Sequence, residues 1–294
     1  ESGYIEQRIE GDWLSPFPQL RRTERPDVVA ASLIEGNVAI LCDNTPFALI
    51  APTTFLSLFQ SPEDYYERWY IVSMIRILRF IAGFFAFTFP ALYIAMTTFH
   101  PGMLPTDLVL SIAAAREGVP FSAVVESLIM VIALEVLREA GVRLPGPIGQ
   151  TIGIVGGLVV GEAAVRAGIV SPIMVIVVAV NAISSFAIPN YSVAIGFRLL
   201  TFILMALAGV AGLYGIMLGL LGLTIHLVTL KSFGAHYLSP FVSFRFSESK
   251  DTLIRGPLPS LEIRPGYTRP QDFDRINDRR HDTIDKAGDE SADQ

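Results

Sequence analysis

The stretch LLTFILMALAGVAGLYGIMLGLLGLTIHLVTL, residues 199–230, decides the fold class because its 32 residues include no Asp, Glu, Lys or Arg. Residues 167–197 form a second uncharged run. A helix that crosses a bilayer needs about 20 mostly apolar residues, and each run is longer than that. One such run could be a buried core helix. Several in series predict a mainly α-helical, polytopic membrane protein.

Charged side chains are concentrated at the two ends of the 294-residue chain. Residues 1–79 hold 18 of them and residues 231–294 hold 21, whereas residues 80–230 hold 11. We therefore expect three parts. Residues 1–70 are the C-terminal part of a soluble cytoplasmic α/β domain, residues 71–235 are a membrane domain of about five to six helical segments, and residues 236–294 are a largely polar cytoplasmic tail.

The soluble portion has a recognisable strand pattern. Apolar runs at 38–42 and 47–50 flank Asp43-Asn44-Thr45-Pro46, which predicts a β-hairpin. Two short strands are not stable alone, so we expect a larger domain. The chain starts at Glu1 and not at Met, and we expect that part of this domain precedes it.

A helix is predicted to begin at Ser61-Pro62-Glu63-Asp64, where Ser61 can cap and Pro62 suits the first turn. We expect this helix to continue into a first span at 80–99, with Tyr65, Tyr66, Trp69 and Tyr70 at the membrane interface. Arg76 and Arg79 are expected to extend to the same interface.

Further segments follow in order. Residues 107–118 are too short to span, and residues 121–140 read as a helix. Apolar segments follow at 148–165 and 169–189, and the polar tail from residue 247 is expected to be poorly ordered. Residues 199–230 form either one long tilted helix or a hairpin around the glycines at 212, 215, 219 and 222. Basic residues before the first, third and fifth segments place both chain ends in the cytoplasm; Arg166 does not fit this scheme.

Composition argues against several functional classes. The net charge is −6 and there is one cysteine, Cys42, which gives neither a basic nucleic-acid surface nor a Cys cluster. The sequence lacks His-Glu-x-x-His, Gly-x-Ser-x-Gly and a phosphate-binding loop. We expect no enzyme activity, no cofactor and no metal site.

Nine ordered stretches resemble the A subunit of bacterial spore germination receptors, the GerA type, over about residues 2–245. They are SPFPQ (15–19), TERPD (23–27), EGNVAIL (35–41), SPEDYY (61–66), VPF (119–121), LREAG (137–141), RLP (143–145), GQTIG (149–153) and SFG (232–234).

This resemblance implies a location and partners. It implies the inner membrane of the bacterial spore, a permease-like B subunit and a lipoprotein C subunit. It also implies that copies of the chain form a homo-oligomer that releases monovalent cations when germination starts. Some relatives amplify the ion signal and are not nutrient receptors, and the sequence does not assign the chain to either branch.

Four glycines at four-residue spacing, Gly149, Gly153, Gly157 and Gly161, lie along one side of a predicted helix. They could pack a helix at a subunit interface around a pore, or pack within one subunit. The opposite face carries Thr151, Val155, Leu158 and Glu162. This stripe is a pore-lining hypothesis, with Val155 and Leu158 as an apolar constriction and Glu162 as a ring of charge.

Ionisable side chains within the apolar region are functional candidates. Glu162 and Arg166 are four residues apart and could instead form a simple pair. The others could form a vestibule or a gate, or pair internally; they are Glu126, Glu135, Arg138 and Glu139. Two alternative functions stay open: a secondary transporter with a site at a broken helix near Pro189, and a non-conducting scaffold of the receptor complex.

Overall fold

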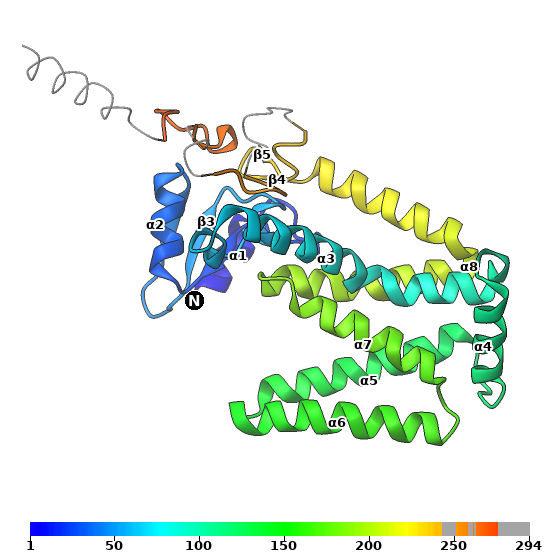
Figure 1. Cartoon of the computed structure of the whole chain (residues 1–294). Helices are drawn as coiled ribbons and strands as arrows, with labels where there is room; N and C mark the ends of the chain where they lie inside the picture. Colours follow the sequence, from blue (N-terminus) through cyan, green and yellow to red (C-terminus); the bar gives the residue numbers. More distant parts are fainter. Residues whose placement is uncertain (243–250, 258–260, 262, 276–294) are drawn as a thin grey trace, which may run out of the picture. The chain divides into compact units, whose positions relative to one another are not determined.

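The computed structural model describes residues 1–242, 251–257, 261 and 263–275, except for the side chains of residues 146–148, 150–152 and 154. The chain forms two compact units. One contains residues 1–78 and 227–294, and the other contains residues 79–226. Helices dominate, and a small sheet accompanies them (Figure 1).

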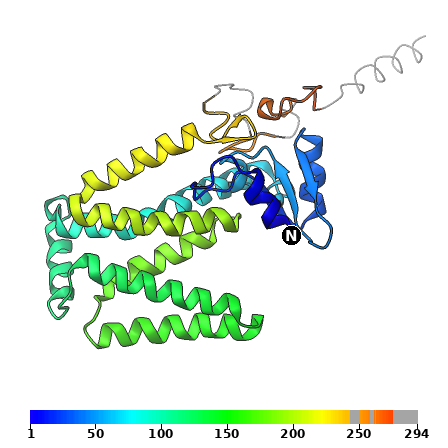
Figure 2. The ribbon, with the colours of Figure 1, turned by 180° about the vertical axis from the view of Figure 1, so that it is seen from behind.

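The first unit is built around a three-stranded antiparallel sheet with strand order β1-β3-β2. Helices α1 and α2 flank this sheet (Figures 1 and 2). Its elements are α1 (Ser2–Ile9), β1 (Arg21–Thr23), α2 (Pro26–Ile34), β2 (Val38–Leu41), β3 (Ala48–Ala51), η1 (Ser57–Phe59), η2 (Pro62–Tyr65), β4 (Lys231–Ser232), β5 (Ala235–His236) and η6 (Gly266–Thr268).

The predicted hairpin is confirmed. Val38 of β2 pairs with Ala51 of β3, and Leu41 pairs with Ala48. Asn44 turns the chain between the two strands with φ 66°, a conformation that Asn tolerates better than most residues. The central strand β3 is buried along its whole length, which explains why its four residues are all apolar.

Residues that follow the last long helix belong to the same unit as the N-terminal sheet. The Ser232 hydroxyl donates to the Gln19 carbonyl at 2.6 Å, and the fully buried Tyr237 donates to the Pro18 carbonyl at 2.7 Å. Residues 251–257 also pack here. The expectation of a poorly ordered tail is wrong for residues 251–257, because Asp251 and Arg255 find buried partners. Residues 276–294 lie outside the described part.

The second unit is helical. Helix α5 packs against both α6 and α7, and α4 packs against α7. Its elements are η3 (Pro101–Met103), α4 (Thr106–Arg116), α5 (Ala123–Arg143), α6 (Gly146–Arg166), α7 (Pro172–Phe186) and most of α8 (Tyr191–Thr229), and it shares α3 (Trp69–Thr98) with the first unit.

The helix expected from residue 61 is interrupted. A capping box does form between Ser61 and Asp64, but the segment is a 3₁₀ helix that ends at Tyr65. A separate helix, α3, begins at Trp69 and contains Pro90. The prediction of one continuous helix is therefore wrong, although the start signal at Ser61 is confirmed.

Helix α8 breaks at Gly212, whose φ of 58° and ψ of −138° are not helical. The second arm folds back from this bend and diverges from the first arm (Figures 1 and 2). A Cβ built at Gly215 would lie 2.1 Å from the Leu207 carbonyl oxygen, which shows how closely the arms approach. Of the two alternatives for residues 199–230, the structure has the hairpin.

Two of the described helices are long and apolar enough to cross a membrane, judged by length and composition: α3 and α8. Helix α7 is apolar but shorter, with 15 residues. The mainly helical fold with a small sheet is thus confirmed.

Candidate functional site

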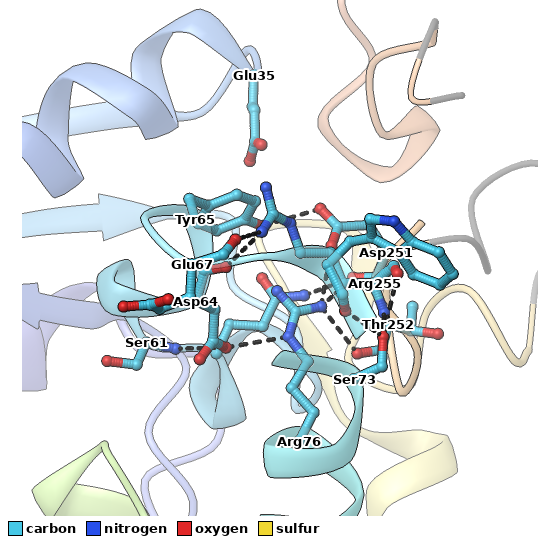
Figure 3. A network of polar contacts seen from close by, with 12 residues as sticks. Glu35, Ser61, Asp64, Tyr65, Glu67, Ser73, Arg76, Asp251, Thr252 and Arg255 are labelled. Atoms are coloured by element: carbon cyan, nitrogen blue, oxygen red, sulfur yellow. Dashed lines mark hydrogen bonds and ion pairs between the residues drawn. The ribbon is translucent and has the colours of Figure 1, made fainter. Parts of the chain in front are cut away.

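A buried network of charges surrounds the N-terminal part of α3 in the first unit (Figure 3). The Arg76 side chain is 1% exposed. Its Nε donates to Asp64 Oδ2 at 3.0 Å, and its Nη1 donates to Asp251 Oδ1 at 2.9 Å. Nη1 also donates hydrogen bonds to the backbone carbonyls of Asp251 and Thr252, at 3.2 Å each. One guanidinium therefore joins three segments of the chain.

A second arginine of the network binds backbone atoms. Arg255 Nη1 donates to the carbonyls of Asp64 and Glu67, at 2.7 and 2.8 Å. The backbone of Arg255 is in turn bonded to Ser73 on α3: the Ser73 hydroxyl donates to the Arg255 carbonyl at 3.1 Å. Residues 251–255 thus cover the first two turns of α3.

Tyr65 lies between the two arginines. Its ring centroid is 5.6 Å from Arg76 Cζ and 5.2 Å from Arg255 Cζ, and its hydroxyl donates to Asp251 Oδ2 at 2.8 Å. Burial, together with the nearby Asp251 carboxylate, raises the pKa of Tyr65. The tyrosine therefore stays neutral and acts as a donor at neutral pH.

The network holds two guanidinium and two carboxylate groups, so its formal charges balance. Such an arrangement fixes the position of a helix; it does not offer a nucleophile beside a base. In the described ranges no three His, Cys, Asp or Glu side chains are close enough to hold a metal ion. The network therefore has a structural role, which is to hold the N-terminal part of α3 in place.

The stripe expected to line a pore lies on α6, on the side away from α5. Val155 is 52% exposed and Leu158 is 70% exposed. Glu162 is also exposed and pairs with Arg166 at 2.5 Å. The side chain of Thr151 lies outside the described residues. Val155, Leu158 and Glu162 therefore share an exposed face that no described residue covers.

The four glycines of α6 have different surroundings. A Cβ at Gly149 would lie 2.3 Å from the Gly141 carbonyl oxygen of α5, and one at Gly161 would lie 3.5 Å from Val175 of α7. A Cβ at Gly153 or Gly157 would meet nothing within 4 Å. Gly156, outside the predicted stripe, contacts Leu137 of α5 instead, since its Cβ would lie 2.9 Å from that side chain.

The charged candidates on α5 all have partners. The fully buried Glu126 accepts from the Ser171 backbone N–H at 2.6 Å and so caps α7, and its second oxygen lies 3.5 Å from Arg116. Glu135 pairs with Arg138 at 2.6 Å and with Arg198 at 3.1 Å. Glu139 pairs with Arg143 at 2.7 Å on the exposed surface.

Sequence reasoning missed the Arg76 network. Arg76 was expected to extend to a membrane interface, but it is buried and paired, so that expectation is wrong. Asp64 is 12 positions away and Asp251 is 175 positions away, beyond any helical spacing. The single local signal was the charged pair at the Ser61 helix start, which includes Asp64.

Comparison with known proteins gives a clear match. A profile of the family described as Bacillus/Clostridium GerA spore germination protein matches residues 1–267. No solved structure matches the chain.

Three curated relatives illustrate the similarity. Spore germination protein GerLA of Bacillus cereus is 52% identical over 92% of this chain and 55% of the relative. The uncharacterized membrane protein YfkQ of Bacillus subtilis (strain 168) is 54% identical over 92% of this chain and 53% of the relative. Spore germination protein KA of the same strain is 53% identical over 92% of this chain and 50% of the relative. The chain spans about half the length of these relatives.

Proposed function

This chain belongs to the Bacillus/Clostridium GerA family of spore germination proteins, and from that premise we propose that it is the membrane-embedded part of a germination receptor subunit. In this proposal, copies of the subunit form a homo-oligomeric channel that releases monovalent cations during germination. It works in the inner membrane of the spore beside a permease-like B subunit and a lipoprotein C subunit. Both ends of the chain face the cytoplasm, and the subunit is not an enzyme.

The exposed face of α6 is the observation that supports a channel most directly. Leu158 is 70% exposed although it lies in the middle of an apolar helix, and Val155 and Glu162 lie beside it. A ring of leucines can close a pore by excluding water, and a ring of carboxylates attracts cations. In an oligomer around an axis, this face would supply both rings.

The test is potassium efflux from vegetative cells that express the full-length protein. Leu158→Ala shortens the side chain at the proposed constriction, so we expect a potassium leak well above that of the wild type. Leu199→Ala is the matched control, because Leu199 on α8 is 54% exposed and lies outside the α6 stripe. It should leave efflux unchanged.

Glu162→Gln provides a second readout. If Glu162 forms a ring of charge, the neutral variant in the Leu158→Ala background should lower the preference for cations over anions. A well-expressed Leu158→Ala protein without leak would reject the channel. Saturable uptake of one substrate would favour a transporter, and the absence of any flux would favour a scaffold.

A further inference from the structure

A pocket of about 220 Å³ lies in the first unit beside α2, β1 and η2. Eight of its eleven lining residues are polar or charged, and three are apolar. The residues that line it are Arg21, Asp27, Val28, Ala31, Ser32, Glu35, Gln60, Ser61, Pro62, Tyr65 and Tyr66. Small-ligand sites are usually concave and place polar groups beside apolar surface; this one is small, and most of its lining residues are polar.

Arg21 on β1 is the unusual group of this pocket. Its side chain is half-buried, and it makes no hydrogen bond or ion pair with the residues that the structure describes. Its neighbour Arg22 points to the other face of the strand, where it pairs with Glu6 at 3.6 Å and covers the Phe47 ring. Burial lowers the pKa of Arg21, yet a guanidinium stays charged in proteins. The Glu35 carboxylate attracts Arg21 through space and opposes this shift. No described group accepts a hydrogen bond from the guanidinium, however, and a half-buried polar group without a hydrogen bond costs free energy.

The carboxylates that line the pocket are already paired. Glu35 pairs with Arg275 at 3.0 Å, and Asp27 pairs with Arg25 at 2.8 Å. The hydroxyls of Tyr65 and Tyr66 donate to Asp251 and Asp27, at 2.8 and 2.6 Å. Among the charged residues of the lining, Arg21 thus makes no side-chain hydrogen bond to any described residue.

We propose that this pocket binds a small organic anion, which presents a carboxylate or phosphate group to Arg21 and its body to Val28, Ala31 and Pro62. A guanidinium matches both groups in geometry, because it can donate two parallel hydrogen bonds. The bound anion supplies the hydrogen-bond acceptor that Arg21 lacks among its described neighbours. The volume limits the ligand to a few heavy atoms beyond its charged group.

The pocket shares two residues with the Arg76 network. Tyr65 lines the pocket and donates to Asp251, and Gln60 lines it and donates to the Asp251 carbonyl at 2.6 Å. Asp251 in turn binds Arg76 on α3. An anion bound at Arg21 would therefore share the lining residues Tyr65 and Gln60 with the network that holds α3.

The test uses purified full-length protein and two probes, acetate and inorganic phosphate, with chloride at the same ionic strength as reference. Thermal unfolding is recorded as each anion is titrated. A ligand that binds only the folded state raises the unfolding temperature with concentration. We expect such a rise for acetate or phosphate above that for chloride.

Arg21→Gln should weaken the apparent affinity at least tenfold, whereas Arg22→Gln, next to it on the opposite face, should keep the wild-type response. In chloride alone, Arg21→Gln should unfold at about the wild-type temperature or above it, since it removes a half-buried guanidinium that makes no hydrogen bond to a described residue. An unfolding temperature that responds to neither probe, or responds equally in Arg21→Gln, overturns the proposal. A large loss of stability of Arg21→Gln in chloride does so too, because it would make Arg21 a structural residue.

Discussion

Arg76 is the residue on which the first unit depends most clearly, since its guanidinium binds Asp64, Asp251 and two backbone carbonyls while fully buried. Removing one partner of a buried ion pair leaves the other charge uncompensated in the low-dielectric interior, which lowers the free energy of unfolding by about 3–5 kcal/mol. We therefore expect Arg76→Ala to lower the free energy of unfolding of the full-length protein by that order, measured by equilibrium denaturation.

Arg25→Ala is the matched control for Arg76→Ala. Arg25 also pairs with two carboxylates, those of Asp27 and Glu63, but all three side chains are exposed to water. Exposed pairs contribute little because solvent screens them and side-chain entropy opposes them. Comparable losses in the two variants would contradict the view that burial makes the Arg76 network strong.

Glu35 gives a prediction about pH. Its pKa lies above the ordinary value of 4.5 because it is buried, although Arg275 opposes the shift. The folded chain holds this proton more tightly than the unfolded chain does. The contribution of Glu35 to stability is therefore fully present below pH 4.5 and is lost as the pH rises through the raised pKa. The side chain of Gln does not titrate, so Glu35→Gln lacks this pH-dependent contribution.

The measurement is the unfolding temperature of the wild type and of Glu35→Gln between about pH 4 and about pH 7. The stability of the wild type relative to the variant should fall as the pH rises. Other titrating groups, such as Glu6 and Glu10, are common to both proteins and cancel. A relative stability that increases with pH would show that the ion pair with Arg275 outweighs burial.

Residue roles were harder to predict than residue locations. The pairs Glu135–Arg138 and Glu162–Arg166 follow from helical spacing and are confirmed by short contacts. The network of Arg76 and the pair of Glu35 with Arg275 do not follow from spacing. They arise because residues 251–257 and 263–275 contact the N-terminal residues, and no local pattern encodes those contacts.

At the scale of elements, the evenly spaced glycines of α6 differ in whether they contact a neighbouring helix. Gly149→Ala would force a methyl group to within 2.3 Å of a backbone oxygen of α5, which only a backbone shift can relieve. We expect a loss of about 1–3 kcal/mol in the free energy of unfolding. Gly153→Ala meets nothing within 4 Å and should gain up to about 1 kcal/mol from helix propensity. Denaturation of the two variants side by side measures the contrast, and equal effects would show that α5 does not approach α6 as closely as described.

The bend of α8 is a second prediction at this scale. Gly212 has positive φ, and a Cβ there would lie 2.8 Å from the Phe99 side chain. Gly212→Ala should therefore lower the unfolding temperature, whereas Gly222→Ala, where nothing lies within 4 Å, should not. If α8 were one straight helix, alanine at position 212 would instead stabilise it.

Most helices were predictable as elements. Apolar runs located α5, α6 and α7 to within a few residues, and the break at Pro189 separates α7 from α8 as expected. The interruption of the helix between Tyr65 and Trp69 was not predictable, because Ser61, Pro62 and the acids after it are as good a start for an α-helix as for a 3₁₀ turn. Tertiary bonds from Arg255 to the carbonyls of Asp64 and Glu67 stabilise the break.

At the scale of the whole molecule, the second unit exposes many large apolar side chains, and contact between such side chains and water is unfavourable. Helices α3, α6, α7 and α8 each contribute some, including Phe84, Leu158, Ile183 and Leu221. Soluble monomers rarely expose large contiguous apolar patches. Lipid or neighbouring subunits are the surroundings that such a surface fits, and this leads to a direct test.

Leu221→Arg places a charge on the second arm of α8, where Leu221 is 56% exposed. If that arm lies in the bilayer, an arginine near its middle costs about 2.5–3.5 kcal/mol on insertion. The amount of full-length protein that stays in membranes after alkaline carbonate extraction should then fall several-fold. Leu41→Arg is the control, because Leu41 is 77% exposed on the edge strand β2 of the first unit. Its exposure to water makes arginine harmless there, so its membrane level should equal that of the wild type. Equal levels for both variants would place Leu221 in water and remove the support that the apolar surface lends to a membrane channel.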